Sequence, residues 1–349
     1  MIKIFGQLVL FIAAFFSLHS KSQTPTVEML HSGNKVSIRG LSVVNDNIVW
    51  VSGSNGMVGR SNDAGKTWNW YNAKKFIPDD SMKLKADFRD IEAFDGATAI
   101  IMSVDAPAYI LKTNNGGETW KVVYENKTKG MFLDAMEFWN EQSGIVIGDP
   151  IDGRFFIART FDGGSSWQEI PFDKRPVADS GEAFFAASGT NIRAANRSEA
   201  VFVSGGLRSR LFSKNKPIDL PVIQGGQMTG ANSVAIADNG KKKGGKIIMV
   251  VAGDYLKASS SEKNCVFSND GGKTWKKPIT PPNGYRSSVE FISTKQLVTC
   301  GLTGVDYSTD GGMNWAGINK ESFNVCRKAK NGTAVFFAGG NGRIGKLIL

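Results

Sequence analysis

The sequence has 349 residues, about twice the length of a typical domain, and contains only two histidines. His19 lies in the N-terminal segment, which leaves His31 as the single histidine of the remaining chain. A zinc protease of the H-E-x-x-H type therefore has no ligands here, and a Ser-His-Asp triad could use only His31. Glycine accounts for 40 of the 349 residues, about 11% against an average near 7%. This excess predicts many turns and hence many short strands.

The N-terminus has the pattern of a secretory signal peptide over residues 1–22. Lys3 gives a positive start, Leu8 to Phe16 form a short apolar run, and small and polar residues follow as far as Ser22. The apolar run is too short to cross a bilayer comfortably, and no later stretch is long and apolar enough to do so. An uncleaved anchor is the alternative. We therefore expect an exported protein, periplasmic or extracellular, with residues 23–349 forming one domain.

The net charge of +10 does not predict nucleic-acid binding, because the lysines are mostly scattered and no recognition motif is present. The cysteines are odd in number and comprise Cys265, Cys300 and Cys326. Buried free thiols are the favoured interpretation. Export would also permit a disulfide between Cys300 and Cys326. A catalytic thiol has no support, because no histidine is near in sequence.

One eight-residue phrase occurs five times along the chain. It begins with Ser or Thr, has Asp or Asn at its third position and Gly at its fifth, and ends on Trp. The third positions are Asp63, Asn115, Asp162, Asp270 and Asp310, and the last positions are Trp68, Trp120, Trp167, Trp275 and Trp315. Asp or Asn can bond nearby backbone amides, and glycine supplies the positive φ of a tight turn. The phrase predicts a hairpin turn whose tryptophan packs between neighbouring units. It offers too few ligands for a calcium site.

The spacing of these tryptophans, 52, 47, 108 and 40 residues, predicts the architecture. The gap of 108 is about two units, so the unit over residues 187–222 has lost its phrase. Each unit of about 40–50 residues has room for four short strands, which is typical of a β-propeller blade. Seven units begin near Ser37, Asp87, Met131, Ala187, Gly230, Tyr285 and Phe323. The last unit lacks a fourth strand, which residues 26–32 can supply. We predict an all-β, seven-bladed propeller closed by this N-terminal strand, with six blades as the second choice.

The repeated phrase resembles the Asp-box, also called the bacterial neuraminidase repeat. The blade over residues 137–167 resembles repeats of the plant photosystem II stability/assembly factor family, and the likeness extends over residues 35–349. Four phrases resemble exported bacterial relatives of that family: residues 148–150, residues 181–183 with 187–190, residues 253–255 and residues 284–287. The resemblance implies a scaffold or assembly-type binding protein. The photosystem itself is not carried over, because export alone does not indicate a photosynthetic cell.

Three arginines fall at equivalent places near the starts of innermost strands, namely Arg39, Arg89 and Arg286. Strand alternation places these starts on the face opposite the Asp-box turns, together with Glu182, Tyr255 and Tyr285. Arginine suits a carboxylate because its guanidinium is a two-pronged donor. We therefore predict an anion-binding or carboxylate-binding mouth at this face. The alternative is structural, with the arginines paired to nearby acids such as Asp90, Asp134 or Glu92, or facing the solvated channel.

An enzyme using the same mouth is the competing hypothesis. Sialidases share the Asp-box and clamp a carboxylate with three arginines, but here Ser37-Ile38-Arg39-Gly40 replaces the Phe/Tyr-Arg-Ile-Pro motif. Glycoside hydrolysis needs a pair of carboxylates. The candidates are Glu182, Asp149 and Asp254, with Tyr285 beside them. The G-x-G-x-x-G string at residues 340–345 ends too close to the last residue for a dinucleotide site. We expect no metal or cofactor, and either an envelope or secreted protein partner or a glycan or anionic ligand.

Overall fold

The computed structural model describes residues 24–79, 86–214, 216–239, 241 and 243–349. The predicted signal peptide, residues 1–22, lies outside the described residues. No helix of the described part is long and apolar enough to cross a membrane.

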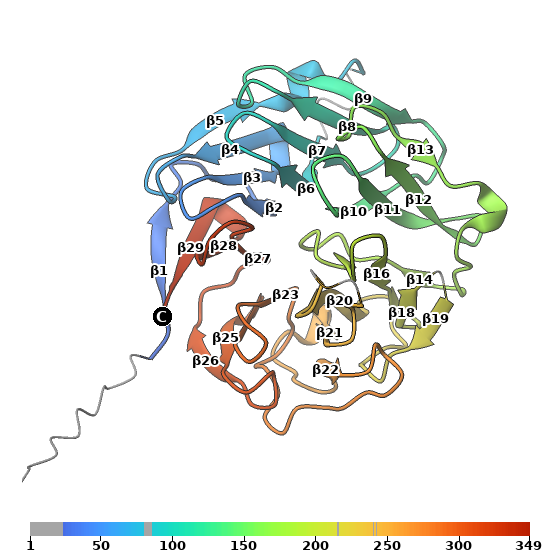
Figure 1. Cartoon of the computed structure of the whole chain (residues 1–349), viewed down its shortest axis with the longest axis vertical. Coiled ribbons are helices and arrows are strands. Elements are labelled where there is room, and N and C mark those ends of the chain that lie inside the picture. Colours follow the sequence, from blue (N-terminus) through green and yellow to red (C-terminus); the bar gives the residue numbers. More distant parts are fainter. Residues whose placement is uncertain (1–23, 80–85, 215, 240, 242) are drawn as a thin grey trace, which may run out of the picture.

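Seven antiparallel sheets stand around a central axis (Figure 1). The prediction of a seven-bladed propeller is confirmed, and the six-bladed alternative is wrong. The first blade contains β2 (Ile38–Val43), β3 (Val49–Gly53), β4 (Met57–Ser61) and β5 (Asn69–Asn72). The second contains β6 (Phe88–Ala93), β7 (Ala99–Ser103), β8 (Ala108–Thr113) and β9 (Lys121–Asn126). The third contains β10 (Leu133–Phe138), β11 (Gly144–Ile151), β12 (Arg154–Thr160) and β13 (Gln168–Glu169).

The remaining blades follow in chain order. Blade four contains β15 (Ile192–Ala194), β16 (Ala200–Val203), β18 (Arg210–Ser213) and β19 (Lys216–Asp219). Blade five contains β20 (Thr229–Ile236), β21 (Ile248–Asp254) and β22 (Cys265–Ser268), joined at its inner edge by β17 (Gly205–Gly206) and β14 (Glu182–Ala183). Blade six contains β23 (Ser288–Phe291), β24 (Leu297–Gly301), β25 (Gly304–Ser308) and β26 (Ala316–Asn319). Short 3₁₀ turns are η1 (Ser54–Gly56), η2 (Ala73–Phe76), η3 (Phe172–Lys174), η4 (Tyr255–Lys257) and η5 (Gly340–Gly342).

The seventh blade joins the two ends of the described chain. It contains β27 (Val325–Lys328), β28 (Val335–Ala338) and β29 (Arg343–Ile348), and β1 (Thr26–His31) is its outermost strand. The register runs from Thr26 opposite Ile348 to His31 opposite Arg343. The predicted closure by an N-terminal strand is therefore confirmed. The pairing protects the outer edge of β29, which would otherwise present free backbone groups.

The core consists of apolar layers between neighbouring blades, because strand alternation sends successive side chains to opposite faces of each sheet. One layer between the first two blades packs Trp50 and Trp120 against Phe88 and Tyr109. Another, between the third and fourth blades, packs Phe155 against Phe184 and Phe212. These layers hold the blades at fixed angles around the axis.

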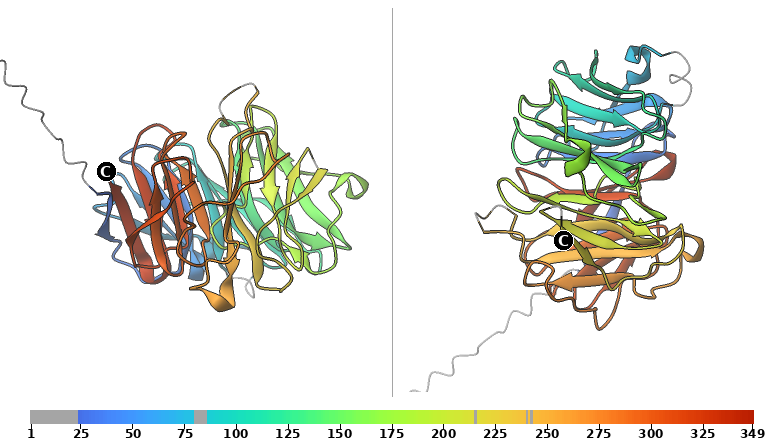
Figure 2. Two further views of the ribbon diagram at one scale, coloured as in Figure 1. Left: turned by 90° about the horizontal axis from the view of Figure 1, so that it is seen from below. Right: turned by 90° about the vertical axis from the view of Figure 1, so that its right-hand side faces the viewer.

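The ring has two faces, which differ in what they carry (Figure 2). We call the face where the innermost strands begin the strand-start face. It also carries the loops between second and third strands, including η4, which projects below the ring in the left view of Figure 2. The opposite face, the Asp-box face, carries the Asp-box turns and the turns between first and second strands.

Blade four departs from the prediction. Its innermost strand begins at Ile192, five residues after the predicted start near Ala187. The residues before it have an apolar and small composition that resembles the start of a strand. They instead enter the central channel, where several other blades hold them.

Candidate functional site

The five Asp-box turns are built alike, from local hydrogen bonds. In the first, Gly65 N donates to Ser61 Oγ at 2.8 Å and Thr67 N donates to Asp63 Oδ1 at 2.9 Å. Trp68 Nε1 donates to Gly65 O at 3.0 Å. In the second turn Asn115 replaces the aspartate and accepts from Thr119 N at 3.0 Å in the same way. The predicted hairpin role of these residues is therefore visible in the contacts.

The box carboxylates lie at the surface, and donor groups of their own turns hold them ionised. Hydrogen bonds from Thr67 lower the pKa of Asp63 to about 2, and those from Thr274 lower the pKa of Asp270 to about 2. Asp162 also has a pKa of about 2, because bonds from its turn outweigh the effect of partial burial. All the donors come from the same eight residues, so these aspartates stabilise turns.

Residues 187–190 of blade four occupy the central channel, and we call this segment the plug. Arg39 Nη1 of blade one donates to Ala187 O at 3.4 Å, and Arg327 Nη2 of blade seven donates to Gly189 O at 2.8 Å. Ser188 Oγ donates to Ser287 O of blade six at 2.8 Å, and Thr190 Oγ1 donates to Ser233 Oγ of blade five at 2.7 Å. The plug thus contacts blades one, five, six and seven.

Gly189 is required at the centre of the plug for two reasons. Its φ of +61° lies in the left-handed region, and a Cβ there would stand 2.3 Å from Cγ of Asp90. The Asp90 carboxylate is buried and accepts from Ile91 N and Met136 N, both at 2.8 Å. Burial raises the pKa of Asp90 well above its usual value. Blade two thus packs its carboxylate directly against the plug.

The predicted mouth on the strand-start face brings Arg39 and Arg89 together. Arg89 Nε is 3.0 Å from Asp87 Oδ2, and its guanidinium carbon lies 5.6 Å from the centre of the Phe132 ring. None of the described carboxylates lies within ion-pair distance of Arg39. Burial, and then the nearby charge of Arg89, lower the pKa of Arg39. A half-buried guanidinium without a carboxylate partner is therefore present at the plug's strand-start side.

The third predicted arginine has a different environment. Arg286 is 1% exposed and donates through Nε to Asp306 Oδ2 at 2.7 Å, with a second bond from Nη2 to the same oxygen. Its Nη1 donates to Tyr285 O at 2.9 Å and to Thr303 Oγ1 at 2.8 Å. The protein itself uses the donors of Arg286, whereas Arg39 and Arg89 remain at the mouth. The ligand-binding role of these residues stays a prediction.

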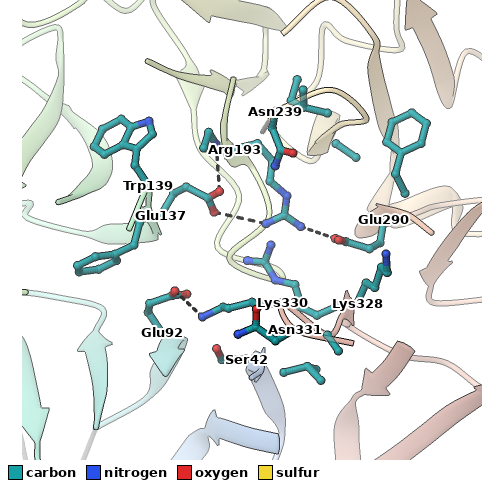
Figure 3. A pocket seen from close by; sticks show the side chains of 18 of the residues that line it. Ser42, Glu92, Glu137, Trp139, Arg193, Asn239, Glu290, Lys328, Lys330 and Asn331 are labelled. Atoms are coloured by element: carbon teal, nitrogen blue, oxygen red, sulfur yellow. Dashed lines mark hydrogen bonds and ion pairs between the residues drawn. The ribbon is translucent and has the colours of Figure 1, made fainter. Parts of the chain in front are cut away.

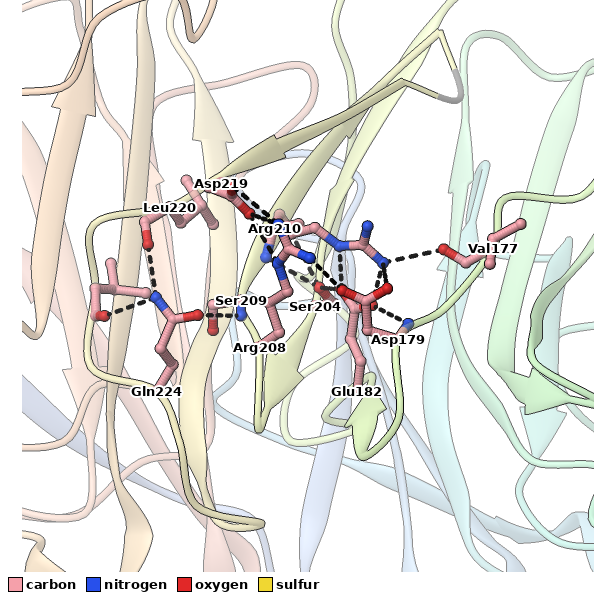
Figure 4. A network of polar contacts seen from close by, with 11 residues as sticks. Val177, Asp179, Glu182, Ser204, Arg208, Ser209, Arg210, Asp219, Leu220 and Gln224 are labelled. Carbon is pink, nitrogen blue, oxygen red and sulfur yellow. Dashed lines mark hydrogen bonds and ion pairs between the residues drawn. The ribbon is translucent and has the colours of Figure 1, made fainter.

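Glu182, on β14 of blade five, lies inside a network of ion pairs with residues of blade four (Figure 4). Its carboxylate accepts from Arg210 through Nε at 2.9 Å and through Nη2, and also from the Ser204 hydroxyl. Its side chain is fully buried. Arg208, 44% exposed, pairs with Asp179 and Asp219 beside it. The network fixes the loop between β16 and β18, and it holds the Glu182 carboxylate away from solvent.

The other predicted candidates separate into anchored and exposed groups. Asp254 accepts from Leu256 N at 2.9 Å and caps η4. Tyr285 is buried and its hydroxyl donates to Asn232 Oδ1 at 3.1 Å, whereas Tyr255 is 48% exposed and meets Tyr285 edge-on. Asp149 accepts from Phe184 N at 2.8 Å. Tyr255 is thus the accessible aromatic group of the mouth.

Asp134 and Asp149 form a carboxyl pair behind the mouth. Burial raises the pKa of Asp149 to about 6. Burial, followed by the charge of Asp149, raises the pKa of Asp134 well above its usual value. Asp134 is fully buried, and neither of its oxygens accepts a hydrogen bond from any described residue.

A cavity of about 900 Å³ opens on the Asp-box face, where the innermost strands end (Figure 3). Arg193 bridges two carboxylates across it, with Nη2 2.6 Å from Glu290 Oε2 and Nη1 3.5 Å from Glu137 Oε2. Lys330 pairs with Glu92 on a further wall. Sequence reasoning missed this cavity. The recurrence of glutamate near the ends of β6, β10 and β23 is the signal that could have found it.

The three cysteines are free and buried. Burial, and then the neighbouring thiol of Cys326, raise the pKa of the Cys300 thiol well above its usual value. The interpretation as buried free thiols agrees with this arrangement.

The turns and the seven-bladed ring define the class of protein: the chain is an Asp-box β-propeller. The BNR/Asp-box repeat model matches residues 266–277. A search of curated proteins finds no match. The structure of YCF48 bound to D1 peptide is similar, with 16% identity and a TM-score of 0.64 over 93% of this chain and 95% of that one.

Two further solved structures share the fold. YCF48 from Cyanidioschyzon merolae has 15% identity and a TM-score of 0.66, over 92% of this chain and 98% of that one. The GH74 xyloglucanase from Xanthomonas campestris has 12% identity and a TM-score of 0.59, over 92% of this chain but 53% of that one. At these identities the likeness concerns the fold. The expected resemblance to the photosystem II assembly factor propeller is confirmed at that level.

Proposed function

We propose that the protein is an exported binding or assembly propeller that takes a segment of another protein on its strand-start face. One observation carries this proposal: exposed apolar side chains on this face include Tyr255, which lies near enough to Arg39 to affect its pKa. The binding of a D1 peptide by the structurally similar YCF48 supports a polypeptide partner.

These side chains, which we call the apolar crescent, follow the rim of blades four and five. Its members, all more than 40% exposed, are Val177, Leu207, Met228, Tyr255 and Leu256. A backbone bond from Tyr255 N to Met228 O, at 3.0 Å, joins two of them directly. Exposed apolar side chains gathered in this way mark interaction surfaces.

Charge decides the chemistry of the partner segment. Arg39 has no carboxylate partner among the described residues, and Arg89 adds a second cation beside it. A carboxylate from the partner would restore the pairing that burial of Arg39 otherwise leaves incomplete. The partner segment is therefore one that carries apolar side chains for the crescent and an acidic group for Arg39.

Site-specific photo-crosslinking in the source cell tests this proposal. A crosslinking residue at Leu256 should capture one protein through a segment containing an acidic residue. The same residue at Phe161, which is 60% exposed in the third Asp-box, is the matched control. Identical adducts at both positions, or none at Leu256, would contradict the proposal.

A synthetic copy of the captured segment then measures the electrostatic part. We expect Arg39→Ala to weaken binding about tenfold or more, the loss of one hydrogen-bonded charge. Changing the segment's acid to its amide should weaken binding to the same extent, and should have no further effect on the Arg39→Ala protein. Affinity that neither change alters would refute the role of Arg39.

Glycoside hydrolysis remains the second hypothesis, and Asp149 is the observation that favours it. A pKa of about 6 suits a general acid. Glu182 and Asp254 support it less well, since one is buried in an ion pair and the other caps η4. Turnover of fluorogenic glycosides, including a sialoside, that Asp149→Asn abolishes and Glu182→Ala leaves intact would favour the enzyme. Absence of turnover would leave the binding role.

A further inference from the structure

The cavity on the Asp-box face is separate from the mouth on the strand-start face. Arg327 lines the cavity and donates to Gly189 O of the plug. Arg327 therefore connects the cavity wall to the plug. The volume of about 900 Å³ is at the upper end of the range of small-molecule sites, roughly 300–1,000 Å³.

The charged groups of the cavity nearly balance, with five cationic side chains and four glutamates in the lining. Arg193 lies between Glu137 and Glu290, and Lys330 pairs with Glu92 (Figure 3). The bridge is well shielded, with the Arg193 side chain 8% exposed. A cationic ligand would compete with Arg193 and Lys330 for these carboxylates. An anionic ligand would meet the four glutamates of the lining.

These ion pairs also hold an array of hydrogen-bonding groups in place. A guanidinium has five N–H donors. Arg193 uses its two terminal nitrogens on carboxylates, and Arg327 makes one bond, to Gly189 O, among the described residues. Glu137 is further fixed by Ala194 N, which donates to its Oε1 at 3.0 Å. Donors and acceptors thus alternate around the walls in fixed positions.

An aromatic side chain completes the lining. Trp139 Nε1 donates to Glu199 O at 3.1 Å, and the Arg159 guanidinium carbon lies 5.6 Å from the centre of a Trp139 ring. Both contacts fix the indole at the cavity wall. Phe291 is a second aromatic residue of the lining. Rigid aromatic groups supply apolar contact area at low entropic cost.

We propose that this cavity is a binding site for a neutral oligosaccharide. The near balance of charge disfavours a strongly charged ligand, and the polar groups of the lining fit a ligand with many hydroxyl groups. Aromatic side chains fit the apolar faces of sugar rings.

Isothermal titration of the whole protein with neutral trisaccharides tests the proposal. The probes are maltotriose, cellotriose, xylotriose and N-acetylated chitotriose. Spermidine, 3′-sialyllactose and a capped tetra-alanine peptide are the cationic, anionic and polypeptide comparators. We expect saturable binding of at least one neutral trisaccharide and weaker binding of all three comparators.

Two variants locate the site, and one serves as a control. Arg327→Ala and Glu290→Gln should each weaken saccharide binding about tenfold, the loss of a hydrogen bond to a charged group. Arg89→Ala, on the opposite face, should leave it unchanged. Unchanged circular dichroism spectra and a cooperative unfolding transition show that the variants are folded.

Three outcomes would overturn the proposal. The first is that none of the four trisaccharides binds. The second is that a comparator binds as tightly as the best trisaccharide. The third is that Arg327→Ala and Glu290→Gln bind saccharide as the natural protein does. None of these outcomes bears on capture at Leu256, so the two proposals fail separately.

Discussion

The Asp-box turns and the central channel satisfy their charges in opposite ways. In a box, an exposed aspartate is bonded by groups within the same eight residues, as Thr67 bonds Asp63. In the channel, a buried charge is bonded from other blades, as Arg193 is bonded by Glu137 and Glu290. The pKa of Asp63 is therefore lowered, whereas burial raises the pKa of Asp90 and Glu290. Hydrogen bonds within a box form the repeated turn, whereas bonds and ion pairs between blades form the plug and the cavity.

The largest effect should come from breaking the channel's central bridge. Arg193→Met leaves Glu137 and Glu290 facing each other without a cation, so we expect a loss of about 3 kcal/mol in unfolding free energy. Urea denaturation measures it. Lys127→Met, which removes an exposed pair with Glu125, is the control and should cost about 1 kcal/mol or less. Equal losses of unfolding free energy in the two variants would show that the buried ion pairs stabilise the protein no more than the exposed pair does.

The plug gives the next largest effect. Gly189→Ala places a methyl group against the Asp90 carboxylate and forces a left-handed residue, so we expect about 2–3 kcal/mol of destabilisation. Gly130→Ala tests the backbone alone, because Gly130 has a φ of +85° with nothing within 4 Å of an added Cβ. It should cost about 1 kcal/mol. A Gly189→Ala protein no less stable than Gly130→Ala would show that the plug is loosely packed.

Asp134→Asn should stabilise the protein at neutral pH by about 1 kcal/mol, because it removes a buried carboxyl whose oxygens accept no bond from the described residues. The folded-state pKa of Asp134 is raised above its usual value of 3.8. The natural protein therefore gains stability from this group as the pH falls from neutrality towards 3.8. The variant should lack that gain in thermal unfolding measured across this range. A destabilised variant would indicate that the Asp134 charge is needed.

The smallest effect at neutral pH, and the opposite pH dependence, should come from the boxes. Replacing Asp63, Asp162, Asp270 and Asp310 by Asn would give every box the neutral side chain that the second already has. The pKa values of about 2 for Asp63, Asp162 and Asp270 lie below the usual 3.8. Their stabilisation is present above about pH 4 and is lost as the pH falls towards about 2. The melting temperature of the fourfold variant should therefore fall less steeply with pH over that interval than that of the natural protein. An equally steep fall in both proteins would contradict the assignment.

The same contrast explains what the sequence could predict. The hydrogen bonds of an Asp-box form between its own eight residues, so the sequence pattern alone was enough to predict the turns. The spacing of the boxes then predicted seven blades. Closure by residues 26–32 followed from the missing fourth strand of the last blade. The plug was not predictable, because the need for glycine at position 189 arises from its contacts with Asp90 and Arg327, which belong to two other blades. Likewise, the strand-start position of Arg286 did not reveal that Asp306, on another strand of its own blade, already holds it.

The pairing of β1 with β29 has a consequence for how the protein is made. Thr26 and Ile348 stand opposite each other across almost the whole chain. A contact between such distant positions forms late, since the entropy of closing the intervening chain must be overcome first. β1 therefore stays unpaired until β29 has been made. A chain shortened within β29 would leave β1 without its partner strand and expose the free backbone groups of both edges. The integrity of the ring thus depends on two strands that lie almost the whole sequence apart.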